Sequence, residues 1–295
     1  MSAAVDLPVR RRTFGRWFAD TGWRHLVGLI MVAFSLLPIV FVVSSSLNPQ
    51  GTLTGSNALF SKIGIDSYVR ILTDPKVPFP MWFANTLIIA GITAIATVFL
   101  GALAAYAFSR MRFTGRRFGL ITIVVVQMFP QLLAVVAIFL LLSTIGDWFP
   151  ALGLNTRLGL ILVYLGGALG VNTYLMYGFF NTVPQSIDEA ARIDGAGHAR
   201  VFFTIILRLV APILAVVALL SFIATVNEFV IASVVLIDTE QQTLAVGLTK
   251  LVSNPRYADW SAFSAGAVMS ALPVVALFLF LQKYIVGGLT AGAVK

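Results

Sequence analysis

Few residues of this sequence have side chains suited to covalent chemistry. The chain contains no cysteine, and its only histidines are His25 and His198; the first fact excludes thiolate chemistry, and the second argues against a dedicated zinc site. One acid, Glu228 in the stretch VNEFVIAS, lies within a long apolar run. A charge is expensive to bury in a membrane and often serves a function there. No nucleophile–base pair or metal-ligand cluster accompanies Glu228, which argues against an intramembrane enzyme.

We therefore treat Asn227 and Glu228 as candidates for the lining or gate of a transport pathway. The alternative for Glu228, weighed equally, is a structural hydrogen bond or a place at the membrane interface. The sequence predicts no catalytic residue and no metal site.

A second distinctive stretch is EAARIDGAGHAR, residues 189–200. Ser186 and Glu189 have the spacing of a capping box, which predicts that a helix begins there. Asp188 and Glu189 fall in its first turn, where the helix dipole favours acids. Gly195 is placed to end the helix in the left-handed conformation. Helical spacing puts four residues on one face: Ile187, Ala190, Ala191 and Asp194.

The predicted product is a short surface helix whose small residues permit close approach of a partner. From the pattern alone, an ordinary polar hairpin between two membrane crossings is the alternative.

The rest of the sequence indicates what positions these residues. Of its 295 residues 59% are hydrophobic, and the mean hydropathy is +0.94, which is typical of an integral membrane protein. Each membrane-spanning helix takes about 20 apolar residues. Six apolar runs predict six such helices in an all-α fold, over residues 26–47, 83–108, 118–142, 158–181, 204–237 and 261–286. Pro212 predicts a kink or break in the long fifth run.

Lysine and arginine residues predict the orientation. With both termini cytoplasmic, fourteen of the twenty lie on the cytoplasmic side. The net charge of +8 then reflects contact with anionic lipid rather than nucleic-acid binding. The resulting organisation begins with a basic N-terminal segment, residues 1–25, that is retained rather than cleaved. A six-helix domain, residues 26–286, follows, with a cytoplasmic loop at 182–203 and outer loops at 48–82 and 238–260. A C-terminal tail covers residues 287–295.

Some small and polar residues inside the predicted crossings are interpreted as packing residues. Gly166 and Gly170 have the Gly-x-x-x-Gly spacing that permits close helix approach. Four others can hydrogen-bond between helices or face a pathway, and packing is the favoured interpretation: Asn85, Thr86, Asn172 and Thr173.

The 189–207 segment resembles the EAA motif of the membrane subunits of ATP-binding-cassette importers. The matching residues are Glu189, Ala190, Ala191, Gly195, Ile205 and Leu207. Arg208 stands where the family has proline, which leaves the local bend in doubt, whereas Pro212 is kept. Further stretches resemble the maltose and maltodextrin permeases of that family, from about residue 36 to the end: AYAFSRMRFTGR, QMFP, LGLNT, YLGG, TLAVG, AVMSALP and GGLTAGAVK.

The resemblance implies the type I importer permease fold, in the cytoplasmic membrane of a prokaryote. It implies a homologous second permease, two copies of an ATP-binding subunit, and an external sugar-binding protein that meets the loop at about 237–260. This chain would carry no cofactor, because ATP and Mg²⁺ are bound by the ATPase subunits; no GxxxxGK[ST] loop occurs in the sequence.

The resemblance also assigns roles to residues. The coupling helix that enters a groove of the ATPase corresponds to Glu189, Ala190, Ala191, Asp194, Gly195, Ala196 and Gly197. The tail that contacts the ATPase corresponds to Gly288, Leu289, Thr290, Ala291 and Gly292.

Two other functions stay open. One is a permease for a different oligosaccharide, such as trehalose, within the same family. The other is an ion-coupled secondary transporter, which predicts intramembrane charge pairs and often repeated halves; the sequence has a lone intramembrane acid and no visible repeat.

Overall fold

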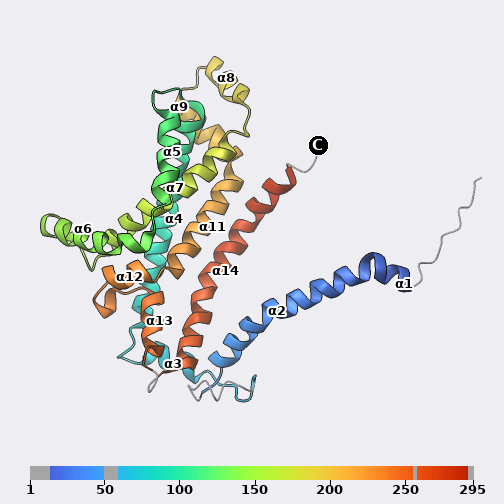
Figure 1. The fold of residues 1–295 in the computed structure, drawn as a ribbon, viewed down its shortest axis with the longest axis vertical. Coiled ribbons are helices and arrows are strands. Elements are labelled where there is room, and N and C mark those ends of the chain that lie inside the picture. The colour runs from blue at the N-terminus through green and yellow to red at the C-terminus, as the bar shows by residue number, and fades with distance from the viewer. Residues whose placement is uncertain (1–13, 50–58, 255–257, 292–295) are drawn as a thin grey trace, which may run out of the picture.

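The computed structural model describes residues 14–49, 59–254 and 258–291, and all regular structure within these ranges is helical (Figure 1). The main helices are α2 (Trp23–Ser46), α3 (Asp66–Thr73), α4 (Phe79–Arg110), α5 (Arg116–Gln127), α6 (Val135–Trp148), α7 (Arg157–Phe180), α8 (Gln185–Ile193), α11 (Ala211–Asn227), α12 (Val230–Val235), α13 (Leu244–Val252) and α14 (Trp260–Ala291). The short elements are α1 (Phe14–Trp17), α9 (His198–Arg200), α10 (Leu207–Leu209), two π-helices at Phe18–Gly22 and Val201–Ile206, and 3₁₀ turns at Gln131–Ala134, Pro150–Leu152 and Thr239–Gln241. The predicted all-α class is confirmed.

The number of membrane crossings depends on two bent pairs of helices. Four spans are continuous: Phe18–Ser46, Phe79–Arg110, Arg157–Phe180 and Trp260–Ile285. Arg116–Gln127 and Leu132–Trp148 meet at 82°, and His198–Leu209 and Ala211–Asn227 meet at 78°. The predicted six crossings agree with the structure when each bent pair forms one span.

The break in the third apolar run was not predicted. α5 ends at Gln127, and Pro130 has an extended backbone with ψ of 114° before the following 3₁₀ turn. Proline has no N–H to continue a helix and disfavours helical conformation in the residue before it. These constraints account for the break inside an otherwise apolar run.

The break in the fifth run lies where Pro212 suggested. The chain bends at Val210, and Pro212 occupies the first turn of α11. Arg208, which stands where the family has proline, lies inside the short helix Leu207–Leu209, and the 78° bend follows at Val210. A second interruption at Glu228 and Phe229 separates α11 from α12.

The core lies where α4 packs along α7 and α11, with α14 on the other side of α11. Near α8 the largest fully buried side chains include Phe180, Met176 and Ile206. At the opposite end, which holds α3 and α13, Phe79 and Trp82 are buried with Leu244. Below, "the α8 end" and "the α13 end" denote these two ends of the molecule (Figure 1).

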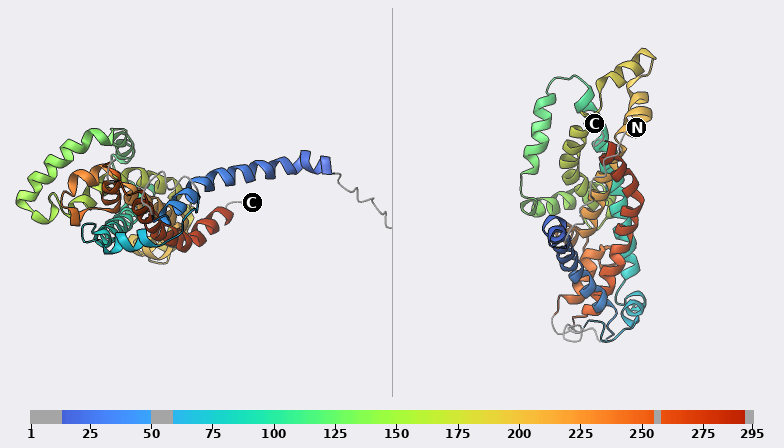
Figure 2. Two further views of the ribbon diagram at one scale, coloured as in Figure 1. Left: turned by 90° about the horizontal axis from the view of Figure 1, so that it is seen from below. Right: turned by 90° about the vertical axis from the view of Figure 1, so that its right-hand side faces the viewer.

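Helix α2 leans away from the other helices (Figures 1 and 2), and its apolar side chains are exposed along most of its length. Only its last residues are buried, where Ser264 Oγ donates to Ser45 Oγ at 3.1 Å and Tyr68 Oη donates to Ser46 Oγ at 2.8 Å. A helix with so much exposed apolar surface is stable out of water, as in a bilayer.

Candidate functional site

The first candidate site is α8 at one extremity of the molecule (Figure 1). Its N-cap is Pro184, with φ −57° and ψ 135°, and no side chain caps it. The predicted capping box of Ser186 and Glu189 is therefore not formed. The N-cap at Pro184 lies two residues before Ser186, which places Ser186 inside the first turn, where its backbone is helical and cannot adopt the N-cap conformation.

The end of α8 follows the sequence-based prediction. Gly195 has φ of +79°, in the left-handed region that favours glycine. Its N–H donates to Arg192 O at 2.9 Å, and the Ala196 N–H donates to Ala191 O at 2.9 Å. These are the two bonds of a Schellman motif, which closes a helix and redirects the chain.

The two faces of α8 differ in burial. Asp188 and Ala191 are buried and Ile187 is half-buried against the bundle, whereas Glu189 and Ala190 are exposed. Ile193 is 87% exposed although it is apolar. The predicted common face is thus divided: Ile187 and Ala191 point inward, and Ala190 and Asp194 lie at the surface. Of the remaining motif residues, Gly195 and Gly197 are exposed and Ala196 is half-buried.

Asp188 pairs with a residue that sequence reasoning did not single out. Arg110 Nε lies 3.0 Å from Asp188 Oδ2, and only 3% and 5% of the two side chains are exposed. Arg110 Nη2 also donates to Val183 O at 2.7 Å. In the sequence Arg110 is one of several arginines that follow the second apolar run. No local pattern reveals the pair, because the partners are distant in sequence.

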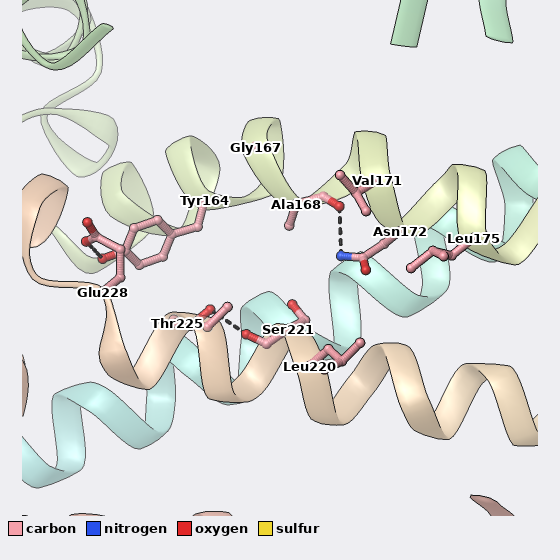
Figure 3. Close-up of a pocket in the computed structure, with 11 residues that line it drawn as sticks. Tyr164, Gly167, Ala168, Val171, Asn172, Leu175, Leu220, Ser221, Thr225 and Glu228 are labelled. Atoms are coloured by element: carbon pink, nitrogen blue, oxygen red, sulfur yellow. Dashed lines mark hydrogen bonds between the residues drawn. The ribbon is translucent and has the colours of Figure 1, made fainter. Parts of the chain in front are cut away.

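The second candidate site is a groove of about 530 Å³ between α7 and α11. Figure 3 shows Tyr164 reaching from α7 toward Glu228 at the end of α11, with Asn172 and Ser221 farther along. Ser221 and Thr225 are buried, and Glu228 is half-buried. The rest of the groove is lined by glycine and apolar residues: Gly167, Ala168, Val171, Leu175, Leu220 and Ala224. Sequence analysis did not single out Tyr164 or Ser221.

Glu228 makes three hydrogen bonds in the groove. Its Oε2 accepts from Tyr164 Oη at 2.6 Å and from the Ala232 N–H at 2.9 Å, and its Oε1 accepts from the Ile231 N–H at 2.8 Å. The carboxylate therefore caps the start of α12. Glu228 is therefore a structural hydrogen-bonding residue that also lines the groove, and its role in a pathway stays a prediction.

Asn227 does not share this site. Its side chain donates to Ile223 O at 2.9 Å and lines a different groove, of about 460 Å³, between α11, α13 and α14. Consecutive residues at the end of α11 thus face different grooves.

Polar residues of α4 hold the segment that follows α12. Trp82 Nε1 donates to Thr239 O at 2.6 Å, and Asn85 Nδ2 donates to Glu240 O at 2.8 Å. Thr86 Oγ1 accepts from the Leu244 N–H at 2.8 Å. Asn85 and Thr86 therefore hold neighbouring segments together, in line with the packing interpretation.

The predicted tail begins inside a helix. α14 continues to Ala291, so Gly288, Leu289, Thr290 and Ala291 have helical backbone, while Gly292 lies outside the described residues. The basic residues Arg10, Arg11 and Arg12 also lie outside them. Within the described ranges, His, Asp and Glu side chains form no group able to hold a metal ion.

Comparison with known proteins adds independent information. Residues 97–290 match the family described as "Binding-protein-dependent transport system inner membrane component". The chain is 40% identical over 282 residues to the "Maltose/maltodextrin transport system permease protein MalG" of Escherichia coli K12, covering 92% of this chain and 94% of that protein. It is 40% identical over 274 residues to MalG of Vibrio vulnificus, covering 90% and 92%.

Solved structures are also similar to this chain. A chain of "a bacterial ABC transporter involved in the import of the acidic polysaccharide alginate" superposes with a TM-score of 0.76 at 27% identity, covering 93% of this chain and 99% of that chain. A second alginate transporter structure, in complex with a pentasaccharide-bound periplasmic protein, gives 0.64 at 17% identity, covering 91% and 96%, and shares the fold.

Proposed function

This chain belongs to the family of binding-protein-dependent transport system inner membrane components, and we propose that it is the permease subunit of an ATP-driven importer of maltose and maltodextrins. The observation that carries the sugar assignment is the 40% identity to MalG over nearly the whole of both chains. The permease itself carries no ATPase role; the chain supplies helices of the pathway and a surface for the energy-coupling partner.

The proposed assembly has a homologous second permease, two ATP-binding subunits that hold ATP and Mg²⁺, and an external sugar-binding protein. In the proposed orientation both termini and α8 lie in the cytoplasm. The arginine content of the α8 end supports this orientation, because positive residues stay on the cytoplasmic side: Arg110, Arg112, Arg116, Arg117, Arg192, Arg200 and Arg208.

The exposed face of α8 is proposed to bind the ATPase subunit. Ile193, almost fully exposed, supplies an apolar contact, and Glu189 with Ala190 supplies a charged and a small one. Burial of the Ile193 side chain against a partner would remove apolar surface from water and favour binding. Gly288 to Gly292 are proposed to reach the ATPase as well, since α14 ends toward the α8 end (Figure 1).

The groove between α7 and α11 is proposed to form this chain's part of the sugar pathway. Glu228, Tyr164 and Asn172 offer a carboxylate, a phenol and an amide, groups that exchange hydrogen bonds with sugar hydroxyls. Asn227 faces a separate groove and is proposed only as a gate residue at the α11–α12 interruption.

Purification tests the assembly. The tagged chain, extracted in mild detergent, should bring down two copies of an ATPase and one different permease. Uptake of labelled maltose by that complex in proteoliposomes, with ATP inside and binding protein outside, should exceed uptake of trehalose. Preference for trehalose would shift the assignment to the alternative sugar. A chain that transports alone, driven by an ion gradient, would refute the importer assignment.

Cross-linking tests the docking face, because the chain has no native cysteine. Ile193→Cys should react with a cysteine-directed cross-linker that captures the ATPase subunit. Ala191→Cys, on the buried face of the same helix, is the matched control and should give no such product. Equal cross-linking from both positions would refute the assignment of the exposed face.

A further inference from the structure

The Arg110 guanidinium joins three segments at the α8 end. Arg110 is the last residue of α4, its Nε lies 3.0 Å from Asp188 in the first turn of α8, and its Nη2 donates at 2.7 Å to Val183 in the turn between α7 and α8. Each charge also suits its position, since a cation is favoured at a helix C-terminus and an anion at a helix N-terminus. The junction is buried, with 3% of the Arg110 side chain exposed.

Such a junction is a poor device for stability alone. Burying two charges costs desolvation energy that their attraction only partly offsets, and an apolar pair of similar volume is often as stable. The Arg110 guanidinium differs from apolar packing in one respect, because its hydrogen bond to Val183 O is directional and its charge attracts Asp188 at the same point. The other buried contacts of α8 come from Ala191 and the half-buried Ile187, and apolar contacts are non-directional.

From this geometry we propose that Arg110 and Asp188 are positioning residues that fix the coupling helix α8 to the end of α4. The proposal rests on the proposed importer function, in which the ATPase displaces α8. With the link intact, that displacement moves α4, which packs along α7 and α11, the two helices that line the groove. Without it, α8 can shift on its apolar contacts while the groove stays unchanged.

Two neighbouring acids of α8, Asp188 and Glu189, have different roles in this proposal. Asp188 is buried against Arg110, and Glu189 is exposed on the face assigned to the ATPase. One acid therefore attaches α8 to its own chain, and the next is free to meet the partner.

The test measures sugar transported per ATP hydrolysed by the reconstituted complex. The double variant Arg110→Met with Asp188→Leu removes both charges and retains apolar volume, so no buried charge is left unpaired. It should assemble and hydrolyse ATP, while sugar transported per ATP falls at least about five-fold, the lower range of allosteric coupling. Asp188→Asn keeps the size of the side chain and removes its charge, and should give a fall in the same direction.

Arg116→Met is the matched control. Arg116 also joins two helices on the α8 end, through Tyr177 Oη at 3.5 Å, but its partner lies on α7 rather than on α8. This variant should keep the wild-type ratio. An equal fall in Arg116→Met would show a general effect of losing an arginine and would overturn the proposal.

The remaining outcomes are distinct. A double variant that keeps the wild-type ratio refutes the link. If the double variant does not assemble, Asp188→Asn decides: an unchanged ratio refutes the link and a reduced ratio supports it. A wild-type complex that lacks sugar-stimulated ATP hydrolysis refutes the proposed function itself, before any variant is compared.

Discussion

The hydrogen bond between Tyr164 and Glu228 gives a sharp prediction about the groove. Tyr164→Phe removes one donor, at 2.6 Å, from a carboxylate that keeps two backbone donors. A hydrogen bond to a charged group contributes about 1.5–3 kcal/mol in soluble proteins, but side-chain bonds between membrane helices average about 0.6 kcal/mol. The bond is short and charge-assisted, so we expect a loss of about 1–2 kcal/mol, between these ranges.

Glu228→Ala should cost more, because it removes the same bond and also the cap of α12. Loss of a helix cap costs about 1 kcal/mol, which brings the expected total to about 2–3 kcal/mol. In the Glu228→Ala background the Tyr164 hydroxyl has lost its acceptor, so adding Tyr164→Phe should cost almost nothing. The double-mutant cycle should therefore return a coupling energy of about 1–2 kcal/mol.

The assay is unfolding of the purified complex in mixed micelles by increasing SDS, with the same protein concentration for all four variants. Tyr174→Phe, an exposed tyrosine on the same helix, is the control and should change stability by less than about 0.5 kcal/mol. Additive losses from Tyr164→Phe and Glu228→Ala would mean that the two side chains do not interact, and would refute the derived geometry of the groove.

Three further predictions concern glycines and the charge in the groove. A Cβ on Gly170 would overlap Gln127 Nε2, so Gly170→Ala should break the 3.0 Å bond from Gln127 to Gly167 O and cost about 1 kcal/mol. Gly166→Ala, which meets nothing within 4 Å, should leave the SDS midpoint unchanged. Gly195→Ala places a side chain at φ +79°, a backbone strain of about 1 kcal/mol. If the ATPase binds α8 in this conformation, affinity in a pull-down titration should fall about five-fold. Unchanged affinity would argue against α8 as the docking element. Glu228→Gln should preserve assembly but reduce sugar uptake in proteoliposomes if the charge serves the pathway, whereas wild-type uptake would assign Glu228 to α12 capping alone.

Sequence reasoning succeeded where one or two neighbouring residues determine the structure. Gly195 ends α8 because only local backbone conformation is involved, and Pro212 begins a helix because its ring excludes a continuous one. It failed at α8's start, where Ser186 had the right spacing but Pro184 had already set the boundary. It also missed the break at Pro130, since the flanking residues are apolar enough to read as one span.

Contacts between distant segments could not be predicted from the sequence. The bond from Arg110 to Val183 joins residues 73 positions apart, and arginines before a loop are expected at any cytoplasmic membrane boundary. Burial is what distinguishes this one, and burial follows from how α4, α7 and α8 meet. The division of Asn227 and Glu228 between two grooves likewise follows from the interruption after α11, which periodicity does not reveal.

Interruptions at both ends of α11 indicate how the groove can change width. The bend at Val210 and the break at Glu228 separate α11 from its neighbours in sequence, so it can shift against α7 without deforming a continuous helix. Among the described residues, the hydrogen bond from Tyr164 to Glu228 joins α7 to the end of α11 and opposes such a shift, at about 1–2 kcal/mol. A preference of about ten-fold for the open groove supplies 1.4 kcal/mol. Under the proposed function, a bound solute with that modest preference for the open groove would offset the bond.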